Sequence, residues 1–217
     1  MSQASFESSW IVHHSADLLV LNKPHGLLCQ PGLGPELADS LISRVQQRWS
    51  EAQLVHRLDR DTSGLILVAL HPALHRQLSG LFAERRIHKR YLADVQGVPA
   101  HLEGLIELPI AKRQHRPPLY GVDPAGKPCS TRWRLLEQGA GCSRLELEPL
   151  TGRSHQLRVH LQAIGHPILG DPLYGPPGPG PSGQRPARLH LHAAALQWLH
   201  PADRKSTRLN SSHQIIS

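Results

Sequence analysis

Four charged residues and a histidine are concentrated in one short run, HRLDRDTSG at positions 56–64. The run stands directly before an apolar segment, where buried charge costs free energy unless it is paired or has a chemical task. Arg57 and Arg60 flank Asp59 and favour its ionised form, which suits a nucleophile better than a general acid. The alternative is an exposed loop whose charges are solvated. Asp59 is therefore the first candidate for a catalytic carboxylate.

The sixteen histidines raise the question of a metal site. His190 and His192 on a strand would point both rings to one face, as zinc ligands can. No third ligand follows at a recognisable spacing. We therefore expect no metal, and interpret the histidines as packing groups or as contacts to a polyanion.

Apolar patterns indicate the elements that position the charged run. The run 18–21 predicts a strand ended by Asn22-Lys23-Pro24, and the continuous apolar run 65–70 predicts a central strand. Residues 36–49 have helical spacing, and a second helix is expected from Pro72, since proline suits a first helical turn. The charged run would thus lead into the core.

The second half of the chain predicts further strands and one more helix. Residues 91–95 and 145–148 alternate as half-exposed strands do, and Ser154 can cap a helix that ends at Gly165. The Pro- and Gly-rich run 175–183 predicts a mobile surface loop. Strands and helices are mixed without a strict βαβ rhythm, which favours an α+β fold.

Composition narrows the functional class. Lys and Arg total 24 against 17 Asp and Glu, a net charge of +7, which suits a polyanionic partner such as nucleic acid. The three cysteines form no paired framework. The chain shows neither a signal segment nor an apolar run that could span a bilayer, so a cytoplasmic protein without a membrane partner is expected.

Several segments, in the same order, resemble those of the RluA-type RNA pseudouridine synthases. The run 56–64 is similar to the family's catalytic motif, and residues 21–28 (LNKPHGLL) to its Asn-Lys-Pro segment. Residues 89–93 (KRYLA), 151–160 (TGRSHQLRVH), 165–171 (GHPILGD) and 191–193 (LHA) match later family segments. The resemblance covers about residues 10 to 201, so chance is a poor explanation.

The resemblance implies a role for each matching residue. Asp59 would be the carboxylate that breaks the uridine's N-glycosidic bond, Arg158 would hold it ionised, and Tyr91 would stack on the extruded base. Arg57 would fill the space that the base leaves in the RNA, and Leu191 would supply an apolar contact beside the base. The remaining expected RNA contacts are His56, Arg60, Thr62, Arg153 and Gln156. Tyr91 could instead be a packed strand residue, and the two arginines of 151–160 could be phosphate contacts or charges on a helix face.

The resemblance also implies a fold, a substrate class and a reaction without cofactor. We expect the pseudouridine synthase fold, a mixed and largely antiparallel sheet flanked by helices and loops around a central RNA-binding cleft. The substrates implied are a large-subunit ribosomal RNA hairpin and a transfer-RNA anticodon arm, and the protein is expected to be a monomer. No cofactor and no metal are expected. The competing hypotheses are a non-catalytic RNA-binding protein with the same fold and a metal-dependent hydrolase.

The C-terminal segment 203–217 departs from the family pattern. Its first eleven residues match one reading frame of a common sequencing-library adapter, so we interpret it as adapter read-through. The alternative is a genuine polar tail. We therefore predict a catalytic domain over 1–202, truncated at its C-terminus, and a disordered tail that does not pack as a strand.

Overall fold

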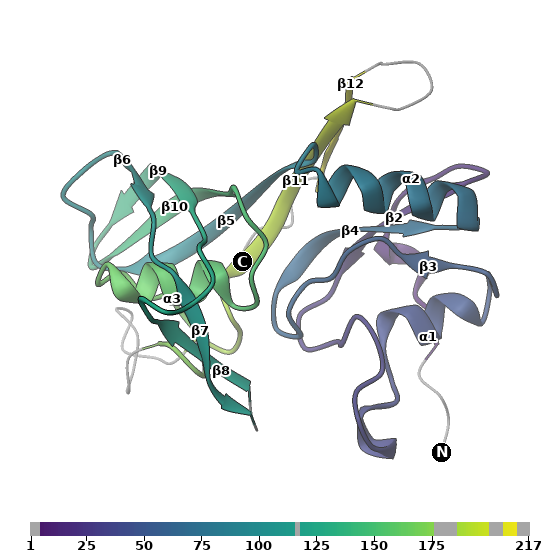
Figure 1. Cartoon of the computed structure of the whole chain (residues 1–217), viewed down its shortest axis with the longest axis horizontal. Helices are drawn as coiled ribbons and strands as arrows, with labels where there is room; N and C mark the ends of the chain where they lie inside the picture. The colour runs from purple at the N-terminus through teal and green to yellow at the C-terminus, as the bar shows by residue number, and fades with distance from the viewer. Residues whose placement is uncertain (1–4, 116–117, 176–185, 200–205, 212–217) are drawn as a thin grey trace. The chain divides into compact units, whose positions relative to one another are not determined.

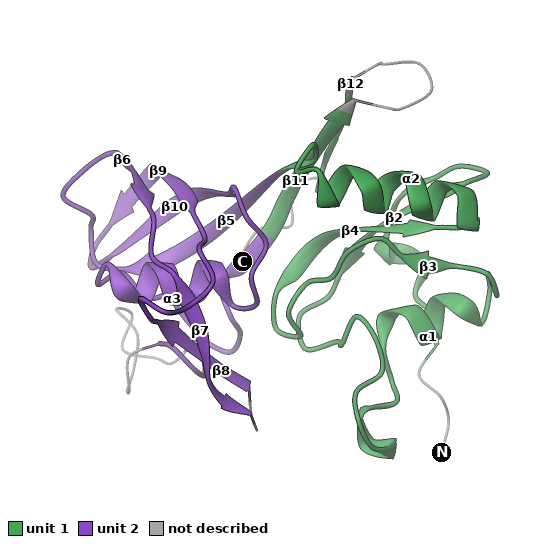
Figure 2. Ribbon diagram, in the orientation of Figure 1, with its two compact units in different colours: residues 1–88, 193–215, 217 green, residues 89–192, 216 purple. Residues whose placement is uncertain are grey.

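The computed structural model describes residues 5–115, 118–175, 186–199 and 206–211. The chain forms two compact units, which Figure 2 distinguishes by colour. Unit 1 comprises residues 1–88 and 193–215 with residue 217, and unit 2 comprises residues 89–192 with residue 216. The chain passes from unit 1 to unit 2 after residue 88 and returns to unit 1 after residue 192. The two units are described in turn.

Unit 1 is built on antiparallel pairs of strands (Figure 1). The order is β1 (Ile11–His14), β2 (Leu18–Lys23), β4 (Ser63–Ala69) and β11 (Leu191–Leu199), whose first two residues belong to unit 2. The short β3 (Gln53–Leu54) also pairs with β4. The helices are η1 (Ser8–Trp10), η2 (Pro35–Leu37), α1 (Leu41–Gln46) and α2 (Pro72–Ala83).

The predicted strands and the predicted helix around the charged run are confirmed. Every residue of β4 is buried, as its continuous apolar run predicts. It pairs with β2 in a register that sets Lys23 opposite Gly64. Helix α2 begins at Pro72 and packs Leu78 and Leu81 against this part of the sheet. The charged run is therefore fastened to the core at its C-terminal end.

The helix predicted over 36–49 is shorter and interrupted. Residues 35–37 form the 3₁₀ turn η2, and α1 begins only at Leu41, with Ser40 as a cap whose side chain accepts from the Ser43 N–H. The N–H groups of Leu41 and Ile42 donate to the carbonyls of Leu28 and Cys29. These contacts from outside the helix satisfy the first-turn donors, which sets the start of α1.

Unit 2 contains a four-stranded antiparallel arrangement and a separate hairpin. The order is β5 (His88–Gln96), β10 (Cys142–Pro149), β9 (Thr131–Gly139) and β6 (Glu103–Ile106). The hairpin consists of β7 (Ile110–His115) and β8 (Pro118–Val122), and one helix follows, α3 (Gln156–Ala163). The strands predicted over 91–95 and 145–148 are confirmed as parts of β5 and β10.

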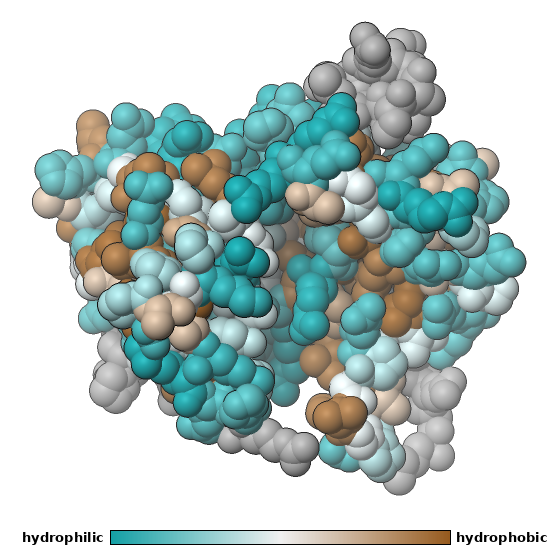
Figure 3. Space-filling view, viewed as in Figure 1, coloured by the Kyte–Doolittle hydropathy of each residue, from teal (hydrophilic) through white to brown (hydrophobic). Residues whose placement is uncertain are grey.

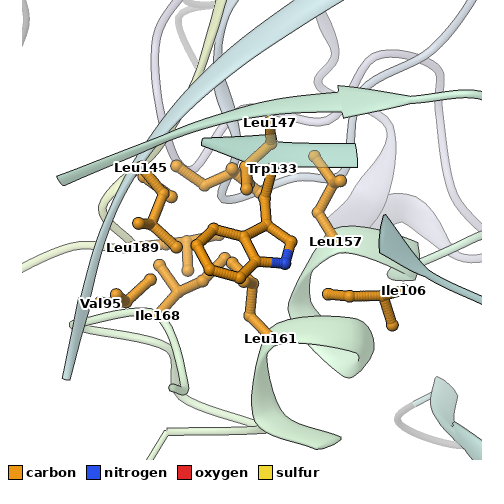
Figure 4. Packing of buried hydrophobic residues seen from close by; sticks show 11 residues of the cluster. Val95, Ile106, Trp133, Leu145, Leu147, Leu157, Leu161, Ile168 and Leu189 are labelled. Atoms are coloured by element: carbon orange, nitrogen blue, oxygen red, sulfur yellow. The ribbon is translucent and has the colours of Figure 1, made fainter. Parts of the chain in front are cut away.

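The core of unit 2 is centred on one indole ring. Figure 4 shows Trp133 of β9 surrounded by aliphatic side chains from β5, β6, β10 and α3. Leu145 and Leu147 alternate inward along β10, while Leu157 and Leu161 come from α3. The alternating residues of β10 and the helically spaced residues of α3 thus pack in the same core, and this packing determines which face of α3 is buried.

Helix α3 begins one residue later than predicted. His155, not Ser154, occupies the cap position, with a left-handed φ of 56° and no capping hydrogen bond from its side chain. Gly165, predicted to end the helix in a left-handed conformation, has a φ of 82°, which confirms that prediction. The helix therefore ends at the glycine that the sequence marks, while its start depends on a histidine in a costly conformation.

The prediction that 203–217 does not pack as a strand is wrong for residues 206–210. These residues form β12 (Ser206–Asn210), which pairs antiparallel with β11 of unit 1, although Arg208 and Asn210 stay exposed. The pairing joins main-chain groups over Ala195–Leu199, and main-chain hydrogen bonds between strands depend little on the identity of the side chains. The remaining residues of 203–217, and most of the loop predicted over 175–183, lie outside the described residues.

The proportion of strands to helices agrees with the sequence. Strands dominate and the helices are few, so the α+β prediction is confirmed. In the part of the chain that the structure describes, no helix has the length and apolar character needed to cross a membrane.

Candidate active site

The Asp59 loop, defined as residues 55–62, turns between β3 and β4 in unit 1. Its side chains divide by exposure: Arg57 and Arg60 are exposed, Asp59 is half-buried and Leu58 is buried. The Thr62 N–H donates to the Asp59 carbonyl at 3.2 Å and closes the turn. The loop thus presents its charges to solvent while its backbone is held from behind.

Lys23 is the main anchor behind the loop. Its side chain is 0% exposed. Its Nζ donates at 2.8 Å to each of three carbonyls, those of Pro24, Leu27 and Arg60. Burial lowers the pKa of Lys23 from 10.5 to about 8, although Cys29, Asp61 and Asp59 favour the charged form. All three N–H donors of the ammonium group are used, so one buried lysine fixes the backbone beside Asp59.

Cys29 is a second anchor, on the other side of Asp59. Its thiol lies 3.2 Å from both the N–H and the carbonyl of Leu58, and it is buried. Burial raises the pKa of the Cys29 thiol, so the group stays protonated at neutral pH and can donate to the carbonyl. The residues on both sides of Asp59 therefore have main-chain contacts to buried side chains.

Two predicted RNA contacts brace the loop from within unit 1. The His56 ring stacks on Phe82 of α2, with centroids 4.5 Å apart, and its Nε2 accepts from the Leu67 N–H at 3.1 Å. Because Nε2 accepts, the neutral ring carries its proton on Nδ1. Thr62 is buried. Their RNA contacts stay predictions, whereas their packing in unit 1 is observed.

Gly64 lets β4 approach β11 closely at the end of the charged run. Its φ is 114°, and a Cβ built there would lie 2.4 Å from the Ala193 carbonyl oxygen. Any side chain would force the two strands apart, so the position requires glycine.

In unit 2, Arg158 is held by a buried carboxylate that the sequence analysis did not assign. Its Nε and one terminal nitrogen each donate to Asp171 at 2.7 Å, and the two side chains are 2% and 0% exposed. The face of the guanidinium lies over the Tyr174 ring, 4.9 Å from its centroid. Arg158 is thus fixed at both its edge and its face. Its predicted pairing with Asp59 stays a prediction.

Gln156, a predicted RNA contact, has hydrogen-bond partners within unit 2, and its contact with RNA stays a prediction. Its Oε1 accepts from Thr151 and from the Arg153 N–H, while its Nε2 donates to the Ser130 carbonyl and to Thr131. Gln156 is 3% exposed. A buried amide with all its partners within the chain acts as a structural clamp. Arg153, whose side chain is exposed, stays a predicted RNA contact.

Tyr91 and Leu191 both lie against the core of unit 2. Tyr91 is on β5, half-buried and opposite Leu147 of β10, and Leu191 is buried at the start of β11. Tyr91 keeps an accessible part, so its stacking role stays a prediction. Leu191 is a core residue, and its contact with a base is likewise a prediction.

The histidines that suggested a metal have other partners. His190 Nδ1 lies 3.2 Å from an oxygen of Asp94, and burial lowers the pKa of His192 to about 4. Within the described ranges, no three histidine, cysteine or acidic side chains come together as metal ligands.

The structure adds four residues that sequence reasoning missed: Lys23, Cys29, Asp171 and Tyr174. Lys23 and Asp171 stand in quoted family segments, but neither had been given a role. Their contacts reach main-chain groups or residues far along the chain, which no local pattern displays. An anchored, half-buried aspartate in unit 1 and exposed cationic side chains are the features expected of an enzyme that acts through a carboxylate on a polyanionic substrate.

The chain belongs to the RNA pseudouridylate synthase family, whose model matches residues 17–163. It is 44% identical over 200 residues to the dual-specificity RNA pseudouridine synthase RluA of Escherichia coli, covering 90% of each chain. The protein of the same name from Yersinia pestis is 44% identical over 193 residues, covering 88% of this chain and 92% of the relative.

Solved structures agree with this family and fold. Human RNA pseudouridylate synthase domain containing 1 is 34% identical and superposes with a TM-score of 0.77, covering 93% of this chain and 82% of the other. Human RNA pseudouridylate synthase domain containing 4 has the same TM-score at 26% identity, covering 94% and 88%. The predicted pseudouridine synthase fold is confirmed.

Proposed function

We propose that the protein is an RNA pseudouridine synthase that converts uridine in structured RNA to pseudouridine, with Asp59 as its catalytic carboxylate. The observation that carries this proposal is the Asp59 loop itself. Lys23 and Cys29 hold the main chain on either side of a half-buried aspartate, in a chain that belongs to this family. Such anchoring keeps the carboxylate where a substrate can reach it.

The reaction is an isomerisation whose atoms balance without a co-substrate. The bond from C1′ of the ribose to N1 of uracil breaks, the base rotates, and a bond forms from C1′ to C5. The hydrogen lost from C5 is replaced by one on N1. The site must position and retain the detached base while the second bond forms. The reaction needs a carboxylate at the sugar–base junction, which is the role proposed for Asp59.

The other proposed roles follow from the need to extract a stacked base. Tyr91 stacks on the extruded uracil and Leu191 contacts it, which offsets the cost of unstacking. Arg57 fills the space left in the RNA. Arg158 pairs with Asp59 and keeps it ionised. His56, Arg60, Thr62 and Arg153 complete the proposed RNA contacts.

The proposed substrates are a large-subunit ribosomal RNA hairpin and a transfer-RNA anticodon arm, acted on by a monomer in the cytoplasm. The relatives' name, dual-specificity, supports two targets. The β7–β8 hairpin supports a folded polyanion, because Lys112, Arg113 and His115 are exposed along one strand.

The experiment that tests the function is pseudouridine mapping in RNA treated with the protein. Total cellular RNA would be incubated with the wild-type chain or with Asp59→Asn, and new pseudouridines located by chemical mapping. We expect new sites with the wild type and a loss of at least about a thousandfold with the variant, as for removal of a nucleophile. RNA affinity should be retained. Binding without new pseudouridine from the wild type would instead indicate a non-catalytic RNA-binding protein.

A further inference from the structure

A bridge of hydrogen bonds joins the β7–β8 hairpin to Tyr174. The main-chain N–H of Tyr120 in β8 donates to the Tyr174 hydroxyl at 2.9 Å, and His155 Nδ1 lies 2.7 Å from the same oxygen. Tyr174 is buried. Its hydroxyl is thus engaged by the hairpin on one side and by the start of α3 on the other.

His155 adopts a strained conformation at this bridge. Its φ of 56° is left-handed, which costs a non-glycine residue about 1–2 kcal/mol. Its ring packs edge-on against both Tyr120 and Tyr174, with centroid distances of 5.1 and 5.5 Å. Strain of this kind persists where surrounding contacts enforce it, and it is often found at functional sites.

The ring of Tyr174 contacts a different residue from those that its hydroxyl binds. It lies under the guanidinium of Arg158, whose edge donates to Asp171. Asp171 also accepts from the main-chain N–H groups of Leu173 and Tyr174, at 2.9 and 3.0 Å. One carboxylate therefore orients the arginine and closes the turn that carries the tyrosine.

The same tyrosine also packs against the inner side of the hairpin. Ile110 of β7 and Val159 of α3 form a small core with Tyr174, and Leu119 and Val122 of β8 pack against it. The outer side of the hairpin is hydrophilic in Figure 3, in agreement with the exposed cations of β7. Tyr174 thus contacts both Arg158 and a basic hairpin.

We propose that Tyr174 is a positioning residue for the reaction, with separate tasks for its ring and its hydroxyl. The ring holds the guanidinium of Arg158 in one fixed orientation for its proposed role in the reaction. The hydroxyl holds the hairpin at a fixed place relative to that guanidinium, so that RNA bound by the hairpin meets a preorganised arginine. This inference rests on the proposed function.

Two substitutions at this position separate the two tasks. Tyr174→Phe keeps the ring and removes both hydroxyl contacts, so KM for RNA should rise about 3- to 10-fold while kcat stays within about twofold. Tyr174→Leu removes the ring as well, so kcat should also fall at least about tenfold. Wild-type KM in Tyr174→Phe, or wild-type kcat in Tyr174→Leu, would overturn the proposal.

A matched control distinguishes positioning from general destabilisation. Trp10→Leu shrinks a buried aromatic side chain of η1 in unit 1, where the ring packs edge-on against Phe6 and lies under the guanidinium of Arg44, outside the Asp59 loop and outside the Tyr174 contacts. It should lower the melting temperature about as much as Tyr174→Leu without changing kcat or KM below the transition. Parallel losses of kcat in Trp10→Leu and Tyr174→Leu would mean that Tyr174 is only structural.

A measurement without turnover separates this inference from the proposed function. The Nε–H resonance of Arg158, assigned by its loss in Arg158→Lys, should shift in Tyr174→Leu and stay unchanged in Tyr174→Phe, since the ring lies over the guanidinium. An unshifted resonance in Tyr174→Leu overturns the contact itself. A wild-type chain that makes no pseudouridine overturns the proposed function, whatever this resonance shows.

Discussion

The Asp59 loop of unit 1 and the Arg158 region of unit 2 are held by different kinds of contact. In the loop, Lys23 and Cys29 bind main-chain groups of Leu58 and Arg60, and among the charged side chains Arg60 pairs with Asp61 at 3.0 Å. Around Arg158, a carboxylate and an aromatic ring bind the functional side chain directly.

The difference shows which side chains are left for a substrate. Anchoring through the main chain leaves the side chains of Arg57 and Arg60 exposed, although Arg60 also pairs with Asp61. Anchoring through the side chain leaves Arg158 rigid and almost fully buried, with a preset orientation. Substitutions of the exposed arginines of the loop should therefore change the free energy of unfolding little. Substitutions around Arg158 should lower it strongly.

The largest expected effect concerns the buried pair of Arg158 and Asp171. Asp171→Ala leaves a buried guanidinium without its carboxylate and should lower the free energy of unfolding by about 3–5 kcal/mol. The matched control is Asp39→Ala, which breaks an equally bidentate pair with Arg44 in which Asp39 is 53% exposed. That loss should stay under about 1 kcal/mol. If urea unfolding gave equal losses of unfolding free energy for the two variants, the expected difference between the buried and the exposed pair would be contradicted.

The second prediction concerns Lys23 and pH. The pKa of Lys23 is about 8 in the folded chain against 10.5 ordinarily, so below pH 8 the cost of burying the charge is fully present. Between pH 8 and 10.5 only the folded state releases the proton, and stability from this group rises with pH. The unfolding free energy of the wild type relative to Lys23→Met should therefore increase by about 3 kcal/mol across this window. A difference independent of pH would show that Lys23 is not desolvated.

A smaller effect is expected at Cys29. Cys29→Ala leaves the buried N–H and carbonyl of Leu58 without the thiol, at a cost of about 1–3 kcal/mol in unfolding free energy. Cys29→Ser retains a donor and an acceptor and should recover most of kcat. Differential scanning calorimetry and initial rates would measure the two variants. A serine variant as impaired as the alanine variant would argue against the main-chain anchor.

The smallest effect on stability is expected at Arg57. The side chain is exposed, so Arg57→Ala should change the unfolding free energy by less than about 0.5 kcal/mol. RNA affinity should nevertheless fall, and binding should depend less steeply on salt, because one cation is removed. Titration of labelled RNA at several salt concentrations measures both. An unchanged affinity would remove Arg57 from the proposed RNA contacts.

The elements that apolar spacing specifies strongly could be predicted from the sequence. Strand β4 and helix α2 follow from a continuous apolar run and from a proline with apolar residues behind it. The helix predicted over 36–49 begins later than predicted, at Leu41, because the carbonyls of Leu28 and Cys29 accept from the first N–H groups of α1. That competition comes from the tertiary structure, which periodicity does not record.

The sequence suggested the proposed reactive residues of the site, but it did not suggest the side chains that hold them. Asp59 stands in a motif of distinctive residue types, whereas Lys23 binds a carbonyl 37 residues away. A carbonyl is present at every position, so its partner leaves no trace in the pattern of residue types. Gln156 likewise binds Ser130 and Thr131, which lie 26 and 25 residues away. Strand β12 was missed because its pairing depends on main-chain groups of β11 more than on its own side chains.

The close approach of Gly64 to Ala193 has a consequence for how mutational surveys of this protein would be interpreted. The position carries no reactive group, yet a single added methyl would displace the strand that follows the carboxylate. A survey of every substitution would find activity lost at Gly64 as at Asp59, although the physical reasons for the two losses are unrelated. Only assays that report folding and turnover separately can distinguish loss of the carboxylate from loss of the space that Gly64 leaves for Ala193.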